Sequence, residues 1–111
     1  MQLRIRAYQT EISAETRAAI ERKVRLALGR QAAGIELAQL TLSQGLPQSL
    51  GSRCRLRVRL RRGGSLMVED HAEDPRSAAA AVAERVEHRL ERERAIRSAT
   101  ALSASGRVRL R

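Results

Sequence analysis

The sequence predicts an α+β fold with the element order β-α-β-β-β-α, in which two helices pack on one face of a four-stranded sheet. Residues 53–61 alternate apolar side chains with arginines, which is the two-residue period of a strand. Residues 14–28 and 75–97 instead repeat their apolar side chains every three to four positions, as helices do. The helices therefore cover one sheet face, and the arginine-bearing face stays open.

The chain opens with a short strand and a capped helix. Residues 2–6 alternate in polarity and predict the strand. Ser13 is a favourable N-cap for the helix over 14–28, because its hydroxyl can accept a hydrogen bond from a free backbone N–H. Gly29 is expected to end this helix as a residue with left-handed backbone. The apolar face of the helix consists of Ile20, Val24, Ala27 and Leu28.

A second strand is expected over residues 35–42. Ile35 and Leu37 have the opposite parity to the apolar residues that follow them, so the entry to this strand is either bulged or still loop. A right-handed crossover through the first helix makes this strand parallel to the first one. Residues 43–52 contain two glycines and a proline and predict a loop before the arginine-rich strand.

The rest of the chain predicts a meander and a terminal helix. Gly63-Gly64 forms a short turn into a fourth strand over 65–71. Asp74-Pro75 starts a helix, because aspartate caps free N–H groups and proline fits the first turn. This helix should fray near residue 97. The domain is thus expected to span 1–97, followed by a disordered basic tail over 98–111.

The composition indicates a polyanionic partner. Lysine and arginine number 22 against 12 aspartate and glutamate, which gives a net charge of +10 and a pI near 11.6. A charge of this size makes nucleic acid or another anionic surface the leading expectation. The chain has one tyrosine and neither phenylalanine nor tryptophan, which argues against RNA readers that stack bases on aromatic platforms. Contacts to phosphates and to RNA shape fit better.

The single cysteine allows no internal disulfide and indicates a reducing cytoplasm. Cys54 belongs to the apolar set of its strand and is interpreted as a small buried hydrophobe rather than a nucleophile. Residues 1–6 contain no long apolar run, so no signal peptide is expected. No stretch approaches the length of a membrane span.

The sequence contains no pattern that is typical of an enzyme. Residues 69–74 form an acidic patch with one histidine, but they lack a recognised metal-ligand spacing, and a strand end followed by a helix cap explains them better. Gly63-Gly64 has no following helix or lysine to hold a phosphate. We therefore expect no catalytic site, no cofactor, no metal and no small-molecule substrate. A nuclease that uses Asp70, His71 and Asp74 is a distant alternative.

The element order and spacing over residues 1 to about 95 resemble the ribosome hibernation-promoting factors, also called ribosome-associated inhibitor A proteins. The segments that carry the resemblance are Met1-Gln2-Leu3-Arg4-Ile5, Glu11-Ile12-Ser13, the 35–42 strand, Gly63-Gly64 and the helix from Asp74 to Arg89-Leu90. The chain departs from the family at Leu26, where a basic residue often lies, and at Asp70, where a small apolar residue is usual. The resemblance implies a short form of the family, without the second, dimerising domain expected of the long form.

The resemblance implies a non-catalytic factor that occupies the mRNA and tRNA channel of the small ribosomal subunit. Such a factor inhibits translation in stress or stationary phase, and a further factor can be needed for ribosome dimerisation. The implied RNA contacts are the basic residues of the two helices, Arg22, Lys23, Arg25, Arg85, Arg89, Arg92 and Arg94. Arg55, Arg57 and Arg59 of the arginine-rich strand are interpreted as an auxiliary phosphate-facing or solubilising surface.

Two other functions remain open at this point. Three antiparallel strands and a terminal helix also resemble the layout of a generic double-stranded-RNA-binding module, which reads shape through phosphates and 2′-hydroxyls. Alternatively, the Arg53–Arg61 strand could serve a protein-interaction module with an acidic partner or a second copy of the chain.

Overall fold

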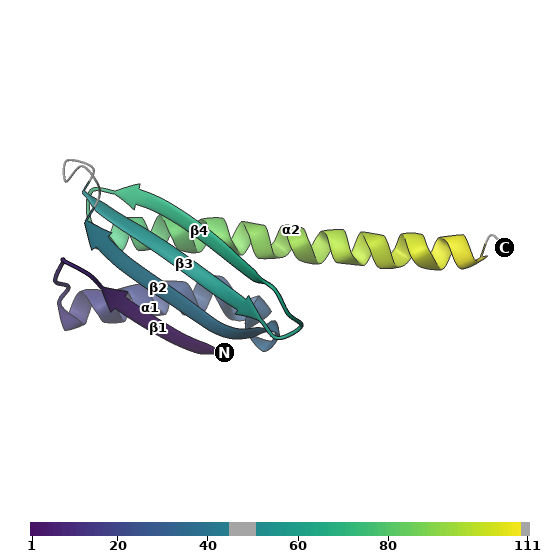
Figure 1. The fold of residues 1–111 in the computed structure, drawn as a ribbon, viewed down its shortest axis with the longest axis horizontal. Coiled ribbons are helices and arrows are strands. Elements are labelled where there is room, and N and C mark those ends of the chain that lie inside the picture. The colour runs from purple at the N-terminus through teal and green to yellow at the C-terminus, as the bar shows by residue number, and fades with distance from the viewer. Residues whose placement is uncertain (45–50, 110–111) are drawn as a thin grey trace.

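The computed structural model describes residues 1–44 and 51–109. They form the predicted α+β fold, with both helices on one side of a four-stranded sheet (Figure 1). The elements are β1 (Gln2–Ala7), α1 (Ala14–Leu28), the short 3₁₀ helix η1 (Gly29–Gly34), β2 (Ile35–Gln44), β3 (Ser52–Leu60), β4 (Ser65–Ala72) and α2 (Pro75–Arg109).

The sheet has the strand order β1-β2-β3-β4. β1 and β2 are parallel, and β2, β3 and β4 form an antiparallel meander, as the sequence predicts. The pairing of β2 with β3 shifts between Ile35 and Leu37, which confirms the bulge at the start of β2. Gly63 and Gly64 have positive φ angles of 104° and 83° in the turn between β3 and β4, a conformation that glycine adopts without steric cost.

The core lies between the sheet and the two helices. Leu40, Leu56 and Val68 stand opposite one another on three neighbouring strands and are buried against α2 or α1. The helix residues that the apolar periodicity identifies are also buried, with Ala27 only partly so. Ile35 and Ala78 are fully buried as well, although the sequence pattern does not single them out. No described helix is both long and apolar enough to cross a membrane.

The first helix begins as predicted but does not end as predicted. The Ser13 hydroxyl accepts a hydrogen bond from the Thr16 amide at 3.0 Å, and α1 runs to Leu28. Gly29, however, has a φ of −52° and is not left-handed. Its N–H bonds to the carbonyl of Leu26, so the last turn tightens and the chain continues as a 3₁₀ helix to Gly34.

The last helix is longer than predicted. Asp74 caps it by accepting a hydrogen bond from the Ser77 amide at 2.8 Å, which confirms the predicted start. The helix then continues through Arg109 instead of fraying near 97 (Figure 1). Residues 98–105 consist of alanine, serine, threonine and leucine and contain neither proline nor glycine, so no residue there breaks the helix. Small polar composition indicates exposure, but it does not by itself end a helix.

Two further expectations concern segment ends. β2 extends to Gln44 and β3 begins at Ser52, so the loop expected over 43–52 is shorter at both ends. Its central residues, 45–50, lie outside the described residues, as do residues 110–111 at the end of the expected tail.

Candidate nucleic-acid interface

The basic side chains of this domain occupy three surfaces. The first is a groove between α2 and the edge strand β4, the second is a groove between α1 and α2, and the third is the open face of the sheet. The residues expected from the sequence to contact RNA are therefore not gathered in one site.

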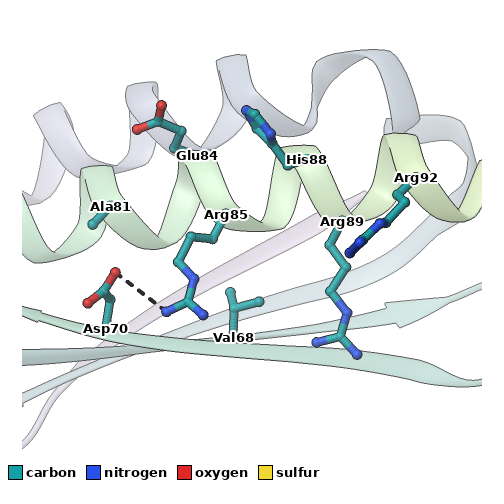
Figure 2. A pocket seen from close by; sticks show the side chains of 8 residues that line it. All are labelled: Val68, Asp70, Ala81, Glu84, Arg85, His88, Arg89 and Arg92. Carbon is teal, nitrogen blue, oxygen red and sulfur yellow. Dashed lines mark ion pairs between the residues drawn. The ribbon is translucent and has the colours of Figure 1, made fainter.

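The groove between α2 and β4 has a volume of about 710 Å³. Three arginines at helical spacing line it, and Figure 2 shows Arg85 and Arg89 extending from α2 towards the strand. Val68 lies at its base, and Asp70 forms an ion pair with Arg85 at 3.5 Å. The groove therefore combines an apolar base with a row of cations and two carboxylates, Asp70 and Glu84, of which Asp70 is paired with Arg85.

Two of these arginines also hold the edge of the sheet. Arg85 donates a hydrogen bond to the backbone carbonyl of Glu69 at 2.8 Å, and Arg89 donates one to the carbonyl of Met67 at 3.1 Å. At the opposite edge, Arg17 of α1 donates to the carbonyl of Ile5 on β1 at 2.9 Å. Carbonyls at a sheet edge would otherwise be open to pairing with another chain. These three arginines therefore have a structural role in addition to any contact with RNA.

The second groove lies between α1 and the first turns of α2. Arg22 and Lys23 of α1 line it together with Arg76, so three cations meet at one end of the helix layer. Leu26 lies among them and is 76% exposed. Arg76 is not among the contacts expected from the sequence, which shows only that it lies in the first turn of a helix. The packing of α2 against α1 brings it close to Arg22 and Lys23.

The same helix interface becomes acidic further along α2. Glu84, Glu87 and Glu91 line the next stretch of the space between the helices, and Glu91 forms an ion pair with Arg30 at 3.8 Å. In its middle part, α2 thus carries Arg85, Arg89 and Arg92 on the side facing β4, and Glu87 and Glu91 on the side facing α1. This separation of charge divides the expected RNA-binding set of the helices into two parts.

The remaining expected residues of the helices differ in their surroundings. Arg25 forms an ion pair with Glu21 one turn earlier, at 3.1 Å. Arg92 lines the groove between α2 and β4, and Arg94 is exposed on the same helix beyond it.

The open sheet face carries six arginines on two strands that are not neighbours. β1 contributes Arg4 and Arg6, and β3 contributes the others, with β2 between them. The residues involved are Arg4, Arg6, Arg53, Arg55, Arg57 and Arg59. The four on β3 confirm the predicted alternation, because Cys54, Leu56, Val58 and Leu60 between and after them are buried. Arg61 lies just past the strand end.

Acidic residues on the open face pair with arginines of β3. Glu69 of β4 accepts hydrogen bonds from Arg53 and from Arg55, the latter at 3.2 Å, and these contacts hold the pKa of the Glu69 carboxyl below its ordinary value. Arg59 forms an ion pair with Glu36 at 3.5 Å. Of the four arginines of β3, three are therefore paired with a carboxylate, and Arg57 forms no ion pair within the described residues.

The acidic patch of residues 69–74 is engaged in contacts within the fold. Glu69 pairs with β3, Asp70 pairs with Arg85, and Asp74 caps α2. The hydrogen bond from the Ser77 amide, followed by that from the Ser77 hydroxyl, lowers the pKa of Asp74. Within residues 1–44 and 51–99, no group of three or more histidine, cysteine or acidic side chains is placed to hold a metal ion.

Cys54 is fully buried in the core, as interpreted from the sequence. Burial raises the pKa of its thiol to about 12, and the charge of Asp70 acts in the same direction. A thiol of this kind is protonated at neutral pH and is a poor nucleophile.

These features define a class of protein: a small α+β domain with several exposed arginine clusters suited to phosphate contact. The chain belongs to the family described as Sigma 54 modulation protein / S30EA ribosomal protein, whose model matches residues 3–97. That match agrees with the resemblance to hibernation-promoting factors, and its extent is close to the range of 1–97 expected for the domain.

Two solved structures share the fold. The N-terminal domain of Protein Y from Thermus thermophilus is 24% identical with a TM-score of 0.67, and the match covers 83% of this chain and 98% of that one. A ribosomal subunit interface protein from Coxiella burnetii is 16% identical with a TM-score of 0.72, covering 86% of this chain and 99% of that one. A search of curated proteins gave no significant match.

Proposed function

We propose that this protein is a non-catalytic, cytoplasmic factor that binds the small ribosomal subunit, occupies its mRNA and tRNA channel, and inhibits translation during stress or stationary phase. The observation that carries the proposal is membership of the S30EA ribosomal protein family across residues 3–97. The basic grooves of the helix layer support it, because ribosomal RNA presents phosphates to such surfaces. A further factor for ribosome dimerisation is compatible with this role.

The proposed contacts are electrostatic. Arg22, Lys23 and Arg76 form one set of cations, and Arg92 with the neighbouring arginines of α2 forms another. Each cation that neutralises a phosphate releases counterions, so the affinity falls steeply as salt rises. Because the acidic side of α2 lies between the two sets, we expect them to contact separate stretches of RNA backbone rather than one continuous stretch.

The test is a sucrose-gradient profile of a cell lysate to which the protein has been added, at a low and a high salt concentration. The wild-type chain should sediment with small subunits at low salt and dissociate at high salt, and it should compete with mRNA and tRNA. The triple charge reversal Lys23→Glu, Arg92→Glu and Arg94→Glu should abolish co-sedimentation.

A matched control reverses three arginines that line neither helix groove. Arg30, Arg61 and Arg62 are exposed around η1 and the turn between β3 and β4, and changing all three to glutamate alters the net charge equally. This control should lose less binding than the first variant. Equal losses in the two variants would contradict the assignment of the helix grooves and would indicate a general charge effect.

The two alternatives predict different results in the same series. A generic double-stranded-RNA binder would bind an arbitrary RNA duplex as tightly as it binds small subunits. A protein-interaction module would associate with its partner after ribonuclease treatment. Either result would overturn the proposed function.

A further inference from the structure

The open sheet face contains arginines that the fold leaves without an acidic partner. Among residues 1–44 and 51–99, Arg53, Arg55 and Arg59 are paired with Glu69 or Glu36, whereas Arg4, Arg6 and Arg57 form no ion pair. All three are exposed. Their positive charge is therefore available to an anionic ligand, which would offset their mutual repulsion.

The strand register places these three arginines around a polar floor. Arg4 of β1 stands opposite Gln39 of β2, and Gln39 stands opposite Arg57 of β3. Arg6 stands opposite Thr41 in the next row of the same face. β1 and β3 are two strand spacings apart, about 10 Å, and successive residues on one face of a strand are about 7 Å apart. The arginines thus flank a shallow strip whose floor is neutral and able to form hydrogen bonds.

This arrangement matches a phosphodiester backbone. Guanidinium groups bind phosphate oxygens through paired N–H donors, and amide and hydroxyl side chains bind phosphate and sugar oxygens. An acidic peptide could also pair with arginines, but the domain belongs to a ribosomal protein family and its helix side already carries basic grooves. An RNA backbone supplies negative charges at regular intervals along the strip, which favours RNA as the occupant.

The position of the strip gives it a distinct role. Both helices lie behind the sheet, so the strip and the helix grooves lie on opposite sides of the domain (Figure 1). The Cα atoms of the molecule extend over 61 × 26 × 19 Å, and the shortest extent separates these two sides. RNA held by one side cannot also be the stretch held by the other.

We propose that the open sheet face is a second RNA-binding surface, in which Arg4, Arg6 and Arg57 hold one stretch of phosphodiester backbone across Gln39 and Thr41 while the helix grooves contact another stretch. The domain then acts as a spacer between two RNA segments. The inference deepens the proposed function and rests on it for the identity of that RNA as ribosomal. The contacts are to backbone, so they are independent of base sequence.

The first experiment measures binding of the full chain to a fluorescent oligouridylate at 50 and 200 mM salt. In the variant, Arg4, Arg6 and Arg57 are each changed to glutamine. Loss of three single-strand phosphate contacts reduces the slope of log affinity against log salt by about 2, so the wild type should lose roughly 20-fold more affinity than the variant over this range. Changing Arg30, Arg61 and Arg62 to glutamine removes the same number of arginines and should retain most of that slope. Because Arg30 and Arg62 are paired with Glu91 and Glu93, Arg57→Gln is also compared with Arg61→Gln, since neither of these two arginines forms an ion pair within the described residues.

The second experiment identifies what the strip touches on the ribosome. Cys54 is fully buried, so a Gln39→Cys variant provides a single accessible thiol for an azidophenyl photocrosslinker. Irradiation of the labelled protein bound to small subunits should yield crosslinks to ribosomal RNA. Crosslinks to a ribosomal protein alone would overturn the proposal in favour of an acidic protein partner.

The remaining outcomes separate this inference from the proposed function. A glutamine variant that binds oligouridylate with the wild-type salt slope would overturn the second surface even if the wild type co-sediments with subunits. Wild-type protein that fails to co-sediment would refute the ribosomal role, while the oligouridylate comparison would still decide whether the strip binds RNA backbone. Circular dichroism and urea unfolding of each variant verify that the fold is intact.

Discussion

The arginines of the open sheet face and those of the helices differ in what their guanidinium groups contact. On the sheet face, Arg57 stands among other cations and polar side chains and has no acidic partner within the described residues. On the helices, Arg17, Arg85 and Arg89 reach back to the sheet and donate hydrogen bonds to backbone carbonyls of the edge strands. One set is directed to solvent, and the other is partly used by the fold itself.

This difference shows that a basic residue on an exposed helix is not automatically a contact for RNA. The three helix arginines satisfy carbonyls at both edges of the sheet, where an unpaired edge would favour association with another chain. Arg85 and Arg89 nevertheless keep further N–H donors, because a guanidinium group has five. We expect their removal to affect stability and RNA binding together, whereas removal of Arg4, Arg6 and Arg57, which form no ion pair within the described residues, should affect binding alone.

The largest effect is expected from a comparison of one substitution on each face of β3. Leu56→Ala empties a fully buried position beneath the helices and should lower the free energy of unfolding by about 2–5 kcal/mol. Arg57→Gln, one residue further along on the open face, should change it by less than about 0.5 kcal/mol. Urea unfolding followed by circular dichroism measures both, and equal losses would show that the arginine face also contributes to the core.

The next largest effect is expected from removing the two arginines of α2 that donate hydrogen bonds to the edge strand β4. Changing Arg85 and Arg89 to glutamine together should lower the free energy of unfolding by about 1 kcal/mol, since two exposed hydrogen bonds from charged donors are weakened. The uncovered edge should also increase self-association, which analytical ultracentrifugation measures at rising protein concentration. Arg92→Gln, in the same groove, is the control and should leave both quantities unchanged.

A smaller effect is expected from Glu69, the carboxylate of β4 that pairs with Arg53 and Arg55 of β3. The pKa of Glu69 is lowered from 4.5 in the folded protein by hydrogen bonds from Arg53 and Arg55. Its ionised form therefore stabilises the fold above pH 4.5, and this contribution disappears as the pH falls through the lowered pKa. In Glu69→Gln, the urea midpoint should decrease less between about pH 5 and about pH 3 than in the wild type. An identical pH profile would show that the contact with Glu69 adds nothing to stability.

The smallest effect concerns the arginines of the sheet face that already have partners. Arg55→Gln combined with Arg59→Gln should leave the fold intact and weaken oligouridylate binding only mildly, because Glu69 and Glu36 already offset part of that charge. Its salt slope should lie between those of the wild type and of the variant that lacks Arg4, Arg6 and Arg57. A complete loss of RNA binding would make the β3 row itself the principal interface.

Most of the fold could be predicted because local patterns and tertiary packing agree. The alternation over 53–61 and the apolar faces of both helices specify which residues are buried, and the caps at Ser13 and Asp74 specify where the helices begin. Helix ends were less predictable. Gly29 continues into a 3₁₀ helix and α2 continues past 97, because ends depend on weak preferences that neighbouring structure easily changes.

The sequence by itself determined the element order, the buried face of each element, the large positive charge and the alternating arginines of the third strand. Only the tertiary structure decided which arginines share a surface. The parallel pairing of β1 with β2 places Arg4 in the same row as Arg57, although they lie far apart in the chain. The packing of α2 turns Arg85, Arg89 and Arg92 towards β4, and Glu87 and Glu91 towards α1. The physical reason is that periodicity fixes which face of an element is apolar, whereas the partners of the polar face depend on elements that are distant in sequence.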